Sequence, residues 1–218
     1  MEKVIAIDGP AGAGKSTVAR KLARHLNYKY LDTGAMYRAV TLAVLNEDIS
    51  PANEKEVSCL ACKIKLNFGQ DSRIFLNGRD VSGQIRTARV DCNVSRVASY
   101  REVRNAMLDL QREIASRGKI VMDGRDIGTR VLPDAEYKFF ITATLEERAR
   151  RRYREIKEKN PDTNFSEIKE RIKKRDRLDR QREHSPLVRS EDAVMIDTTE
   201  LTVDEVLNKI LVHIEKDD

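Results

Sequence analysis

The chain has 218 residues, of which 40% are hydrophobic and 35% charged, and 41 basic against 36 acidic residues give it a net charge of +5. This length suffices for one domain with a sizeable core, so no disulfide framework is required. No apolar run approaches the ~20 residues that span a bilayer, and no signal-peptide pattern opens the chain. We therefore expect a cytoplasmic protein without a membrane partner, and the basic excess favours anionic partners.

Short apolar runs alternate with amphipathic segments along the chain. The run KVIAID precedes apolar residues at helical spacing, Val18, Leu22 and Leu26. A continuous apolar run is typical of a strand covered on both faces, and strands that alternate with helices favour a parallel sheet. The fold class is therefore α/β, with a five-stranded parallel sheet flanked by helices. We expect strands at residues 3–8, 28–32, 119–123, 137–141 and 193–197.

Helix positions are indicated by spacing and by capping motifs. A helix through Met36, Val40 and Val44 follows the second expected strand. In an S/T-x-x-E motif, the hydroxyl and the carboxylate satisfy backbone N–H groups at the start of a helix, so each such motif predicts a helix start. The motifs pair Ser99 with Glu102, Thr144 with Glu147, and Thr202 with Glu205.

Two stretches depart from this alternation. Between residues 64 and 98, IKLNF and RIFLN alternate apolar and polar residues, with a G-Q-D-S turn between them and an N-G pair after them, which predicts an antiparallel insert. Residues 145–183 form a charged run that Pro161 is expected to break into two helices. A charged run is usually a solvated face, and that interpretation stays open for residues 154–174.

Cys59 and Cys62 form a C-x-x-C motif, a spacing found in zinc and redox sites. No second pair follows, and the histidines lie far away in the sequence. Val57 and Ala61 have helical spacing around the motif, so we expect the cysteines on or beside the buried face of a helix.

The segment GPAGAGKS matches the phosphate-binding pattern G-x-x-x-x-G-K-[ST], between an expected strand and an expected helix. Gly12 and Gly14 let the backbone turn its N–H groups around phosphate oxygens. Lys15 can reach the β and γ phosphates, and Ser16 can bind Mg²⁺. The segment therefore predicts a loop that holds phosphate groups, but the motif alone leaves open kinases, GTPases and other ATPases.

The run IVMDGRD is an apolar strand that ends in Asp123. A carboxylate in this place suits a Walker-B aspartate, and with Ser16 it forms the expected Mg²⁺ site. The alternative is a simple turn at a strand end. No N-K-x-D segment for reading guanine is present, and the chain is short for a motor, so a small-molecule kinase remains.

Phosphoryl transfer between two phosphates gathers many negative oxygens and therefore needs several guanidinium groups that close over the site. The charged run supplies them in two clusters at helical spacing. These clusters are Arg148, Arg151 and Arg152, and then Arg175, Asp179 and Arg182.

Four motifs resemble, in order and spacing, those of the bacterial cytidylate kinases, a family of nucleoside monophosphate kinases. They are GPAGAGKST, YLDTGAMYR, DGRDIGT, and KRDRLDRQR followed by SPL. The resemblance covers the whole chain and implies a P-loop NTPase fold, with ATP as donor and CMP or dCMP as acceptor. It also implies a single kinase domain with a core at about 1–34, 99–147 and 190–218, a monophosphate-binding insert at about 35–98 and a helical lid at about 148–182. The implied ATP contacts are Gly9, Pro10, Ala11, Gly12, Ala13, Gly14, Lys15, Ser16 and Thr17.

The resemblance also implies the residues that contact the acceptor. Thr33 stands where we expect serine in many relatives, which keeps a hydroxyl and adds a methyl group. The implied phosphate contacts are Arg38, Arg125 and Arg175, and the implied nucleoside contacts are Thr33, Ser95, Arg104, Asp126, Asp179 and Arg182.

Residue chemistry favours cytosine over uracil. Asp126 can accept a hydrogen bond from the exocyclic amine of cytosine, and Arg104 or Arg182 can donate to the ring carbonyl. The expected reaction is in-line attack by an acceptor phosphate oxygen on the γ-phosphate of ATP, without a protein nucleophile. The residues expected to act in catalysis are Lys15, Arg125, Arg148, Arg152 and Arg175.

Two other functions stay open from the sequence. A P-loop ATPase could bind nucleic acid through the basic helices, but aromatic residues make up only 5% of the chain and form no base-stacking cluster. A kinase of another small acceptor, such as shikimate or dephospho-coenzyme A, would share the phosphate-binding loop. We expect a monomer that binds nucleotides and no nucleic acid.

Overall fold

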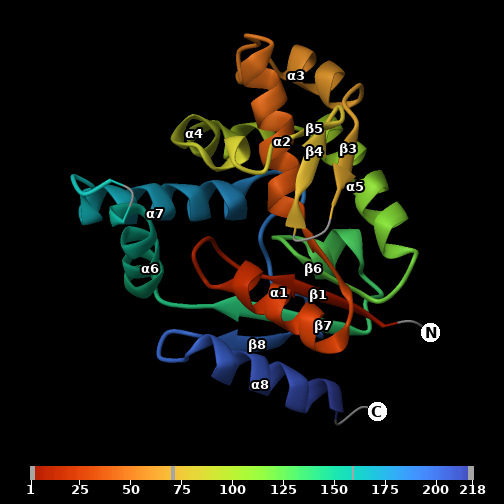
Figure 1. Cartoon of the computed structure of the whole chain (residues 1–218), viewed down its shortest axis with the longest axis vertical. Coiled ribbons are helices and arrows are strands. Elements are labelled where there is room, and N and C mark those ends of the chain that lie inside the picture. Colours follow the sequence, from red (N-terminus) through yellow and green to blue (C-terminus); the bar gives the residue numbers. More distant parts are fainter. Residues whose placement is uncertain (1–2, 70–71, 159, 216–218) are drawn as a thin grey trace. The chain divides into compact units, whose positions relative to one another are not determined.

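The computed structural model describes residues 3–69, 72–158 and 160–215. Within these ranges the chain forms two compact units. The first contains the residues up to Tyr30 and from Gly118 onward, and the second contains Leu31–Arg117. Figure 1 shows the elements of both units in sequence colours.

The first unit is built on a sheet with the strand order β2-β6-β1-β7-β8. β1 pairs in parallel with β6 and β7, and β7 pairs in parallel with β8. The five expected strands are confirmed with small shifts at their ends. They are β1 (Val4–Asp8), β2 (Lys29–Asp32), β6 (Ile120–Asp123), β7 (Tyr137–Thr142) and β8 (Val194–Asp197).

Helices α1 and α8 contribute to one apolar core with this sheet. Ile5 and Ile7 of β1, Leu22 of α1, Phe139 of β7 and Ile210 of α8 are almost fully buried in it. Two further helices, α6 and α7, share a smaller core of Ala149, Ile168 and Ile172, and the chain between them contains Pro161 as expected. The helices are α1 (Lys15–Leu26), α6 (Leu145–Lys157), α7 (Phe165–Gln181) and α8 (Val203–Glu215).

The second unit combines helices with a three-stranded sheet, β3-β4-β5, which is antiparallel. The N-G pair makes the two-residue turn between β4 and β5, with φ of 49° at Asn77 and 82° at Gly78. The predicted G-Q-D-S turn includes Gln70 and Asp71, which lie outside the described residues. The elements are α2 (Thr33–Asn46), α3 (Glu54–Ala61), β3 (Leu66–Phe68), β4 (Ile74–Leu76), β5 (Arg79–Asp80), α4 (Ala88–Val97) and α5 (Arg101–Ala115).

The antiparallel pattern expected over residues 64–98 ends at Asp80. The later part of that range forms a short 3-10 turn (Gln84–Arg86) and then α4. Val90, Val94 and Val97 are buried at helical spacing, so packing of one helix face determines this segment.

Two of the three capping predictions are confirmed. The Thr144 hydroxyl accepts from the N–H of Glu147, and Thr202 and Glu205 form the full reciprocal pair. The prediction for Ser99 is wrong, because its hydroxyl donates to the carbonyl of Arg96 at 2.7 Å, near the end of α4. α5 therefore begins after Tyr100 without a side-chain cap.

The cysteines of the C-x-x-C motif do not lie on the buried face of α3. Val57 and Ala61 are buried as expected, but Cys59 and Cys62 are exposed. On an α-helix, a residue two positions from Val57 projects to the opposite side. In the described part of the chain, His, Cys, Asp and Glu side chains form no cluster of three that could hold a metal ion.

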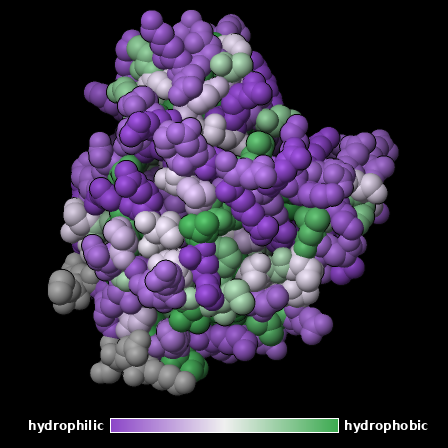
Figure 2. All heavy atoms as spheres, turned by 180° about the vertical axis from the view of Figure 1, so that it is seen from behind, coloured by the Kyte–Doolittle hydropathy of each residue, from purple (hydrophilic) through white to green (hydrophobic). Residues whose placement is uncertain are grey.

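The molecular face in Figure 2 is mostly hydrophilic, with hydrophobic residues in small patches. Scattered apolar residues of this kind are normal on a protein surface. None of the helices in the described ranges has both the length and the apolar character that a bilayer-spanning segment needs.

Candidate active site

The loop between β1 and α1 has a backbone that requires glycine. Gly9 has φ of 143°, and a Cβ there would lie 1.9 Å from the carbonyl oxygen of Ile141 on β7. Gly12 has φ of 77°, and a Cβ there would lie 3.1 Å from Cβ of Arg148 on α6. Gly14 has φ of 89° and immediately precedes α1. The loop thus leads directly into a helix N-terminus, which favours anions.

Lys15 is buried at the start of α1, and its Nζ donates a hydrogen bond to the carbonyl of Pro10 at 2.8 Å. Burial lowers the pKa of Lys15 to about 7, and the nearby charge of Arg125 adds to this effect. Asp123 and Asp8 act in the opposite direction. Added phosphate oxygens would stabilise the charged ammonium, because an opposite charge at close range favours the ionised form.

Asp123 lies at the carboxyl end of β6, beside β1 in the sheet. Its Oδ2 accepts a hydrogen bond from the hydroxyl of Ser16 at 2.8 Å, and its Oδ1 accepts one from the hydroxyl of Tyr30 at 2.7 Å. A hydroxyl and a carboxylate are the oxygen donors that Mg²⁺ prefers, so these residues fit a magnesium site. The sequence places Ser16 and Asp123 107 positions apart, and the fold brings them together.

Four further predicted residues meet in the first unit. Arg125 Nε donates to Asp179 Oδ2 at 2.9 Å, and Arg182 lies 3.7 Å from Asp126 Oδ1. Burial alone would raise the pKa of Asp179, but Arg125, Arg175 and Arg182 together hold it below its usual value. This cluster combines fixed carboxylates with guanidinium groups, which suits recognition of a polar anionic ligand.

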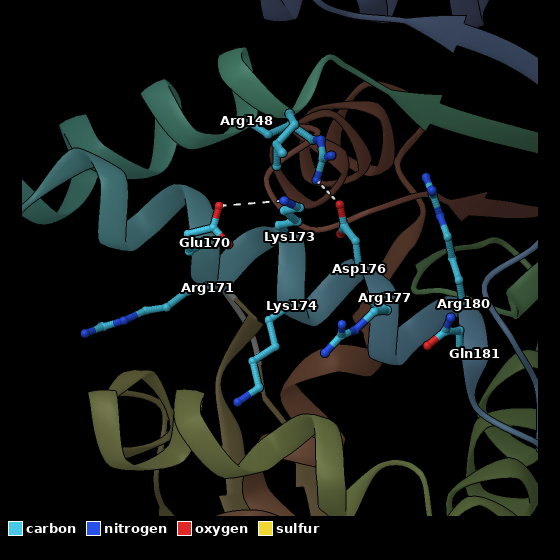
Figure 3. Close-up of a pocket in the computed structure, with 10 residues that line it drawn as sticks. Arg148, Glu170, Arg171, Lys173, Lys174, Asp176, Arg177, Arg180 and Gln181 are labelled. Carbon is cyan, nitrogen blue, oxygen red and sulfur yellow. Dashed lines mark hydrogen bonds and ion pairs between the residues drawn. The ribbon is translucent and has the colours of Figure 1, made fainter.

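Arg148 ties α6 to both α7 and the phosphate-binding loop. Its guanidinium donates to Asp176 Oδ2 at 2.6 Å, to the carbonyl of Ala11 at 3.0 Å and to the carbonyl of Ala143 at 3.0 Å. Figure 3 shows this contact between Arg148 and Asp176, and both residues line a groove of about 760 Å³ together with other residues of α6 and α7. Arg148 is therefore buried in a hydrogen-bond network that includes α6, α7 and the phosphate-binding loop.

The neighbouring arginines of α6 are less enclosed. Arg151 donates to the hydroxyl of Thr198 at 3.0 Å and pairs with Glu147, while Arg152 pairs with Glu155 at 2.9 Å. Both are half-buried.

The second unit holds another set of predicted acceptor residues. Thr33 is buried in the first turn of α2, whose N-cap is Asp32. Arg38 is buried on the same helix, where it lies 2.5 Å from Asp91 Oδ1 and donates to the carbonyl of Ile85 at 3.1 Å. Burial lowers the pKa of Arg38, and Asp91 opposes that effect. The guanidinium is thus held in place before any ligand binds.

Arg104 on α5 is also buried, and its guanidinium carbon lies 5.1 Å from the centre of the Tyr37 ring. It donates to the carbonyl of Ala98 at 3.0 Å. Ser95 lies half-buried on α4. A cation that stacks on an aromatic ring keeps a defined orientation, which suits a recognition role.

Three residues of the site were not predicted from the sequence. Tyr30 and Asp176 bind predicted residues through contacts between distant segments, for which local patterns give no signal. Asp8 ends β1 as Asp123 ends β6, and it accepts backbone hydrogen bonds from Ile127 and Gly128. A carboxylate at the end of an apolar strand was the available signal for Asp8.

The central strand of the parallel sheet leads into this glycine-dependent loop, and the Ser16–Asp123 contact lies beside it. These features define the class of P-loop nucleotide-binding proteins. Solved structures agree on the fold. A shikimate kinase from Bacteroides thetaiotaomicron matches with a TM-score of 0.52 at 13% identity, covering 99% of both chains. A gluconokinase from Sinorhizobium meliloti 1021 matches with a TM-score of 0.51 at 13% identity, covering 99% of this chain and 93% of the other.

Within this class, the chain belongs to the cytidylate kinase family, whose model matches residues 5–216. A cytidylate kinase from Caldanaerobacter subterraneus subsp. tengcongensis is 53% identical over 212 residues, which cover 97% of this chain and 94% of the relative. A cytidylate kinase from Bacillus thuringiensis is 50% identical over 210 residues, covering 95% and 93%. The family resemblance of the four sequence motifs is thereby confirmed.

Proposed function

We propose that the protein transfers the γ-phosphoryl group of ATP to CMP or dCMP and releases CDP or dCDP with ADP. Family membership over nearly the whole chain carries this proposal. An oxygen of the acceptor phosphate forms the new bond to the γ-phosphorus, and the bond from that phosphorus to the β-phosphate oxygen breaks. No protein nucleophile is needed, so the enzyme acts by positioning and by neutralising charge.

The donor half of the site is the loop from Gly9 to Thr17. Its glycine conformations and the helix N-terminus support phosphate binding, and Lys15 supplies a positive charge at that place. Ser16 and Asp123 would hold Mg²⁺, which neutralises phosphate charge when it is bound.

The acceptor half consists of phosphate contacts and nucleoside contacts. We assign Arg38, Arg125 and Arg175 to the acceptor phosphate. Burial and ion pairing of Arg38 and Arg125 support this, because such guanidinium groups are held in place before the ligand arrives. We assign the nucleoside to Thr33, Ser95, Arg104, Asp126, Asp179 and Arg182.

Charge on the transferring group would be neutralised by Lys15, Arg125, Arg148, Arg152 and Arg175. Arg148 already donates to Ala11 and Asp176, so it also keeps α6 and α7 attached to the loop. We propose a monomeric cytoplasmic enzyme of one kinase domain, with an acceptor-binding insert at about 35–98, a lid at about 148–182 and no nucleic-acid or membrane partner.

A panel of acceptors tests this function. ADP release is measured with ATP and each of CMP, dCMP, UMP, AMP, shikimate, dephospho-coenzyme A and single-stranded polynucleotide. We expect the highest kcat/KM with CMP or dCMP. Higher activity with shikimate or dephospho-coenzyme A, or ATP hydrolysis stimulated by the polynucleotide, would show that the protein has one of the other two functions.

A further inference from the structure

Asp8 is a buried carboxylate to which the proposed reaction gives no direct part. It ends β1, immediately before Gly9, and only 5% of its surface is exposed. Its Oδ1 accepts a hydrogen bond from the N–H of Ile127 at 2.9 Å, and its Oδ2 accepts one from the N–H of Gly128 at 2.8 Å. Both carboxylate oxygens are therefore used to hold a segment that lies far away in the sequence.

That segment is a single π-helical turn, Ile127–Val131, directly after Asp126. The first N–H groups of a helical turn have no carbonyl acceptor inside it. The later amides of Arg130 and Val131 donate to the carbonyl of Asp126 at 2.9 and 3.1 Å. Asp8 thus supplies from β1 the acceptors that the start of this turn lacks.

We propose that Asp8 is a positioning residue that holds the 126–128 segment so that Asp126 can read the acceptor base. The inference rests on the proposed function, because it assigns Asp126 to the base. The backbone of Asp8 is held independently of its side chain, through the β1–β7 register in which Asp8 lies opposite Phe140. A change of the side chain should therefore disturb residues 126–128 and leave the phosphate-binding loop in place.

The negative charge of Asp8 offers a second explanation for an effect on activity, because it influences the pKa of Lys15. Burial raises the pKa of Asp8 to about 6, backbone hydrogen bonds and Lys15 oppose the rise, and Asp126 adds to it. In return, the negative charge of Asp8 raises the pKa of Lys15. The charged groups around Asp8 are therefore Lys15 and Asp126, and the Lys138 side chain of β7 lies next to Gly128 of the π-helical turn.

The variant Asp8→Asn distinguishes positioning of residues 126–128 from an effect on the charge of Lys15. The amide keeps the shape but presents an N–H₂ group to one of the two N–H donors, so one backbone bond is lost. We expect kcat/KM for CMP to fall by about 10- to 100-fold, KM for ATP to change by less than about 3-fold, and the preference for CMP over UMP to shrink by about 10-fold. These changes should be present at both pH 6.5 and pH 8.

An equal loss with CMP and UMP that grows between pH 6.5 and pH 8 would overturn the proposal, because Asp8 would then act through the charge of Lys15. Asp204→Asn is the matched control. Asp204 is an exposed carboxylate paired with Lys21 at 2.7 Å, and its variant should keep the wild-type kinetics. Circular dichroism shows whether each variant folds.

Amide exchange tests the same contact without any activity. In the wild type, the protection of the Ile127 and Gly128 amides should fall between pH 7 and pH 5, as Asp8 takes up a proton. Equal protection at both pH values would overturn the proposal, even if Asp8→Asn does not fold. A wild-type enzyme that shows no preference for CMP would count against the proposed function alone, and the amide exchange would still decide the role of Asp8.

Discussion

Lys15 is buried, and burial of its ammonium group lowers the free energy of unfolding of the protein without ligand wherever the group must be charged. Its pKa is about 7 in the folded protein, against an ordinary value of 10.5 for a lysine in the unfolded chain. Between these values the unfolded chain binds more protons than the folded protein. The free energy of unfolding therefore rises with pH across this range.

Lys15→Met removes this dependence, because its side chain does not titrate. The free energy of unfolding of the wild type, minus that of the variant, should increase from pH 7 to pH 10.5 and stay level below pH 7. Urea denaturation at several pH values measures it. A difference that does not vary with pH would show that Lys15 is not buried as described. Turnover of the folded variant should fall by at least about 100-fold.

Asp126 is the residue on which selection of the acceptor base is proposed to depend. Cytosine offers an amine where uracil offers a carbonyl, so a carboxylate attracts the first and repels the second. Asp126→Asn should reduce kcat/KM for CMP more than for UMP, shrinking the discrimination by about 1–3 kcal/mol. The measurement is kcat/KM for both nucleotides in both proteins. If both values fall by the same factor, Asp126 has a role in positioning and not in base selection.

Helices α6 and α7 contain ion pairs of very different burial, and one of them joins the two helices. The side chains of Arg148 and Asp176 are 6% and 9% exposed, whereas those of Arg171 and Glu167 within α7 are 69% and 65% exposed. A buried charge that loses its partner costs far more than an exposed one.

Asp176→Asn should therefore lower the free energy of unfolding by about 1–3 kcal/mol, because Arg148 loses its charged partner. Glu167→Gln is the matched control, with an expected change below about 0.5 kcal/mol. Urea denaturation compares the two variants with the wild type. Equal effects would mean that the Arg148–Asp176 pair does not hold the helices together.

Helices and strands could be predicted from the sequence where the local residue pattern agrees with the burial seen in the structure. The strand β6 is apolar up to its last residue, Asp123, and the Thr202–Glu205 motif begins a helix. Ser99 shows the limit, because a hydroxyl between two helices can serve the end of one or the start of the next. In the candidate site, the Tyr30–Asp123 contact joins residues 93 positions apart, and only the folded sheet brings them together.

At the scale of the whole molecule, ligand binding should protect particular segments from hydrogen exchange. CMP together with a non-hydrolysable ATP analogue should protect residues 33–104 and 145–182 more than residues 193–215, because the first two ranges contain the proposed acceptor and lid residues. Each ligand alone serves as the control. Uniform protection along the chain would contradict the proposed acceptor and lid roles of these segments.

In the proposed reaction, the γ-phosphoryl group of ATP passes directly to CMP or dCMP. The most direct measurement uses ATP labelled at the γ-phosphorus, with CMP as acceptor, and follows the label through the products. We predict that the label appears in the β-phosphate of CDP in a one-to-one ratio with the ADP formed. Label that appears as inorganic phosphate, at a rate independent of CMP, would contradict direct transfer and identify an ATPase.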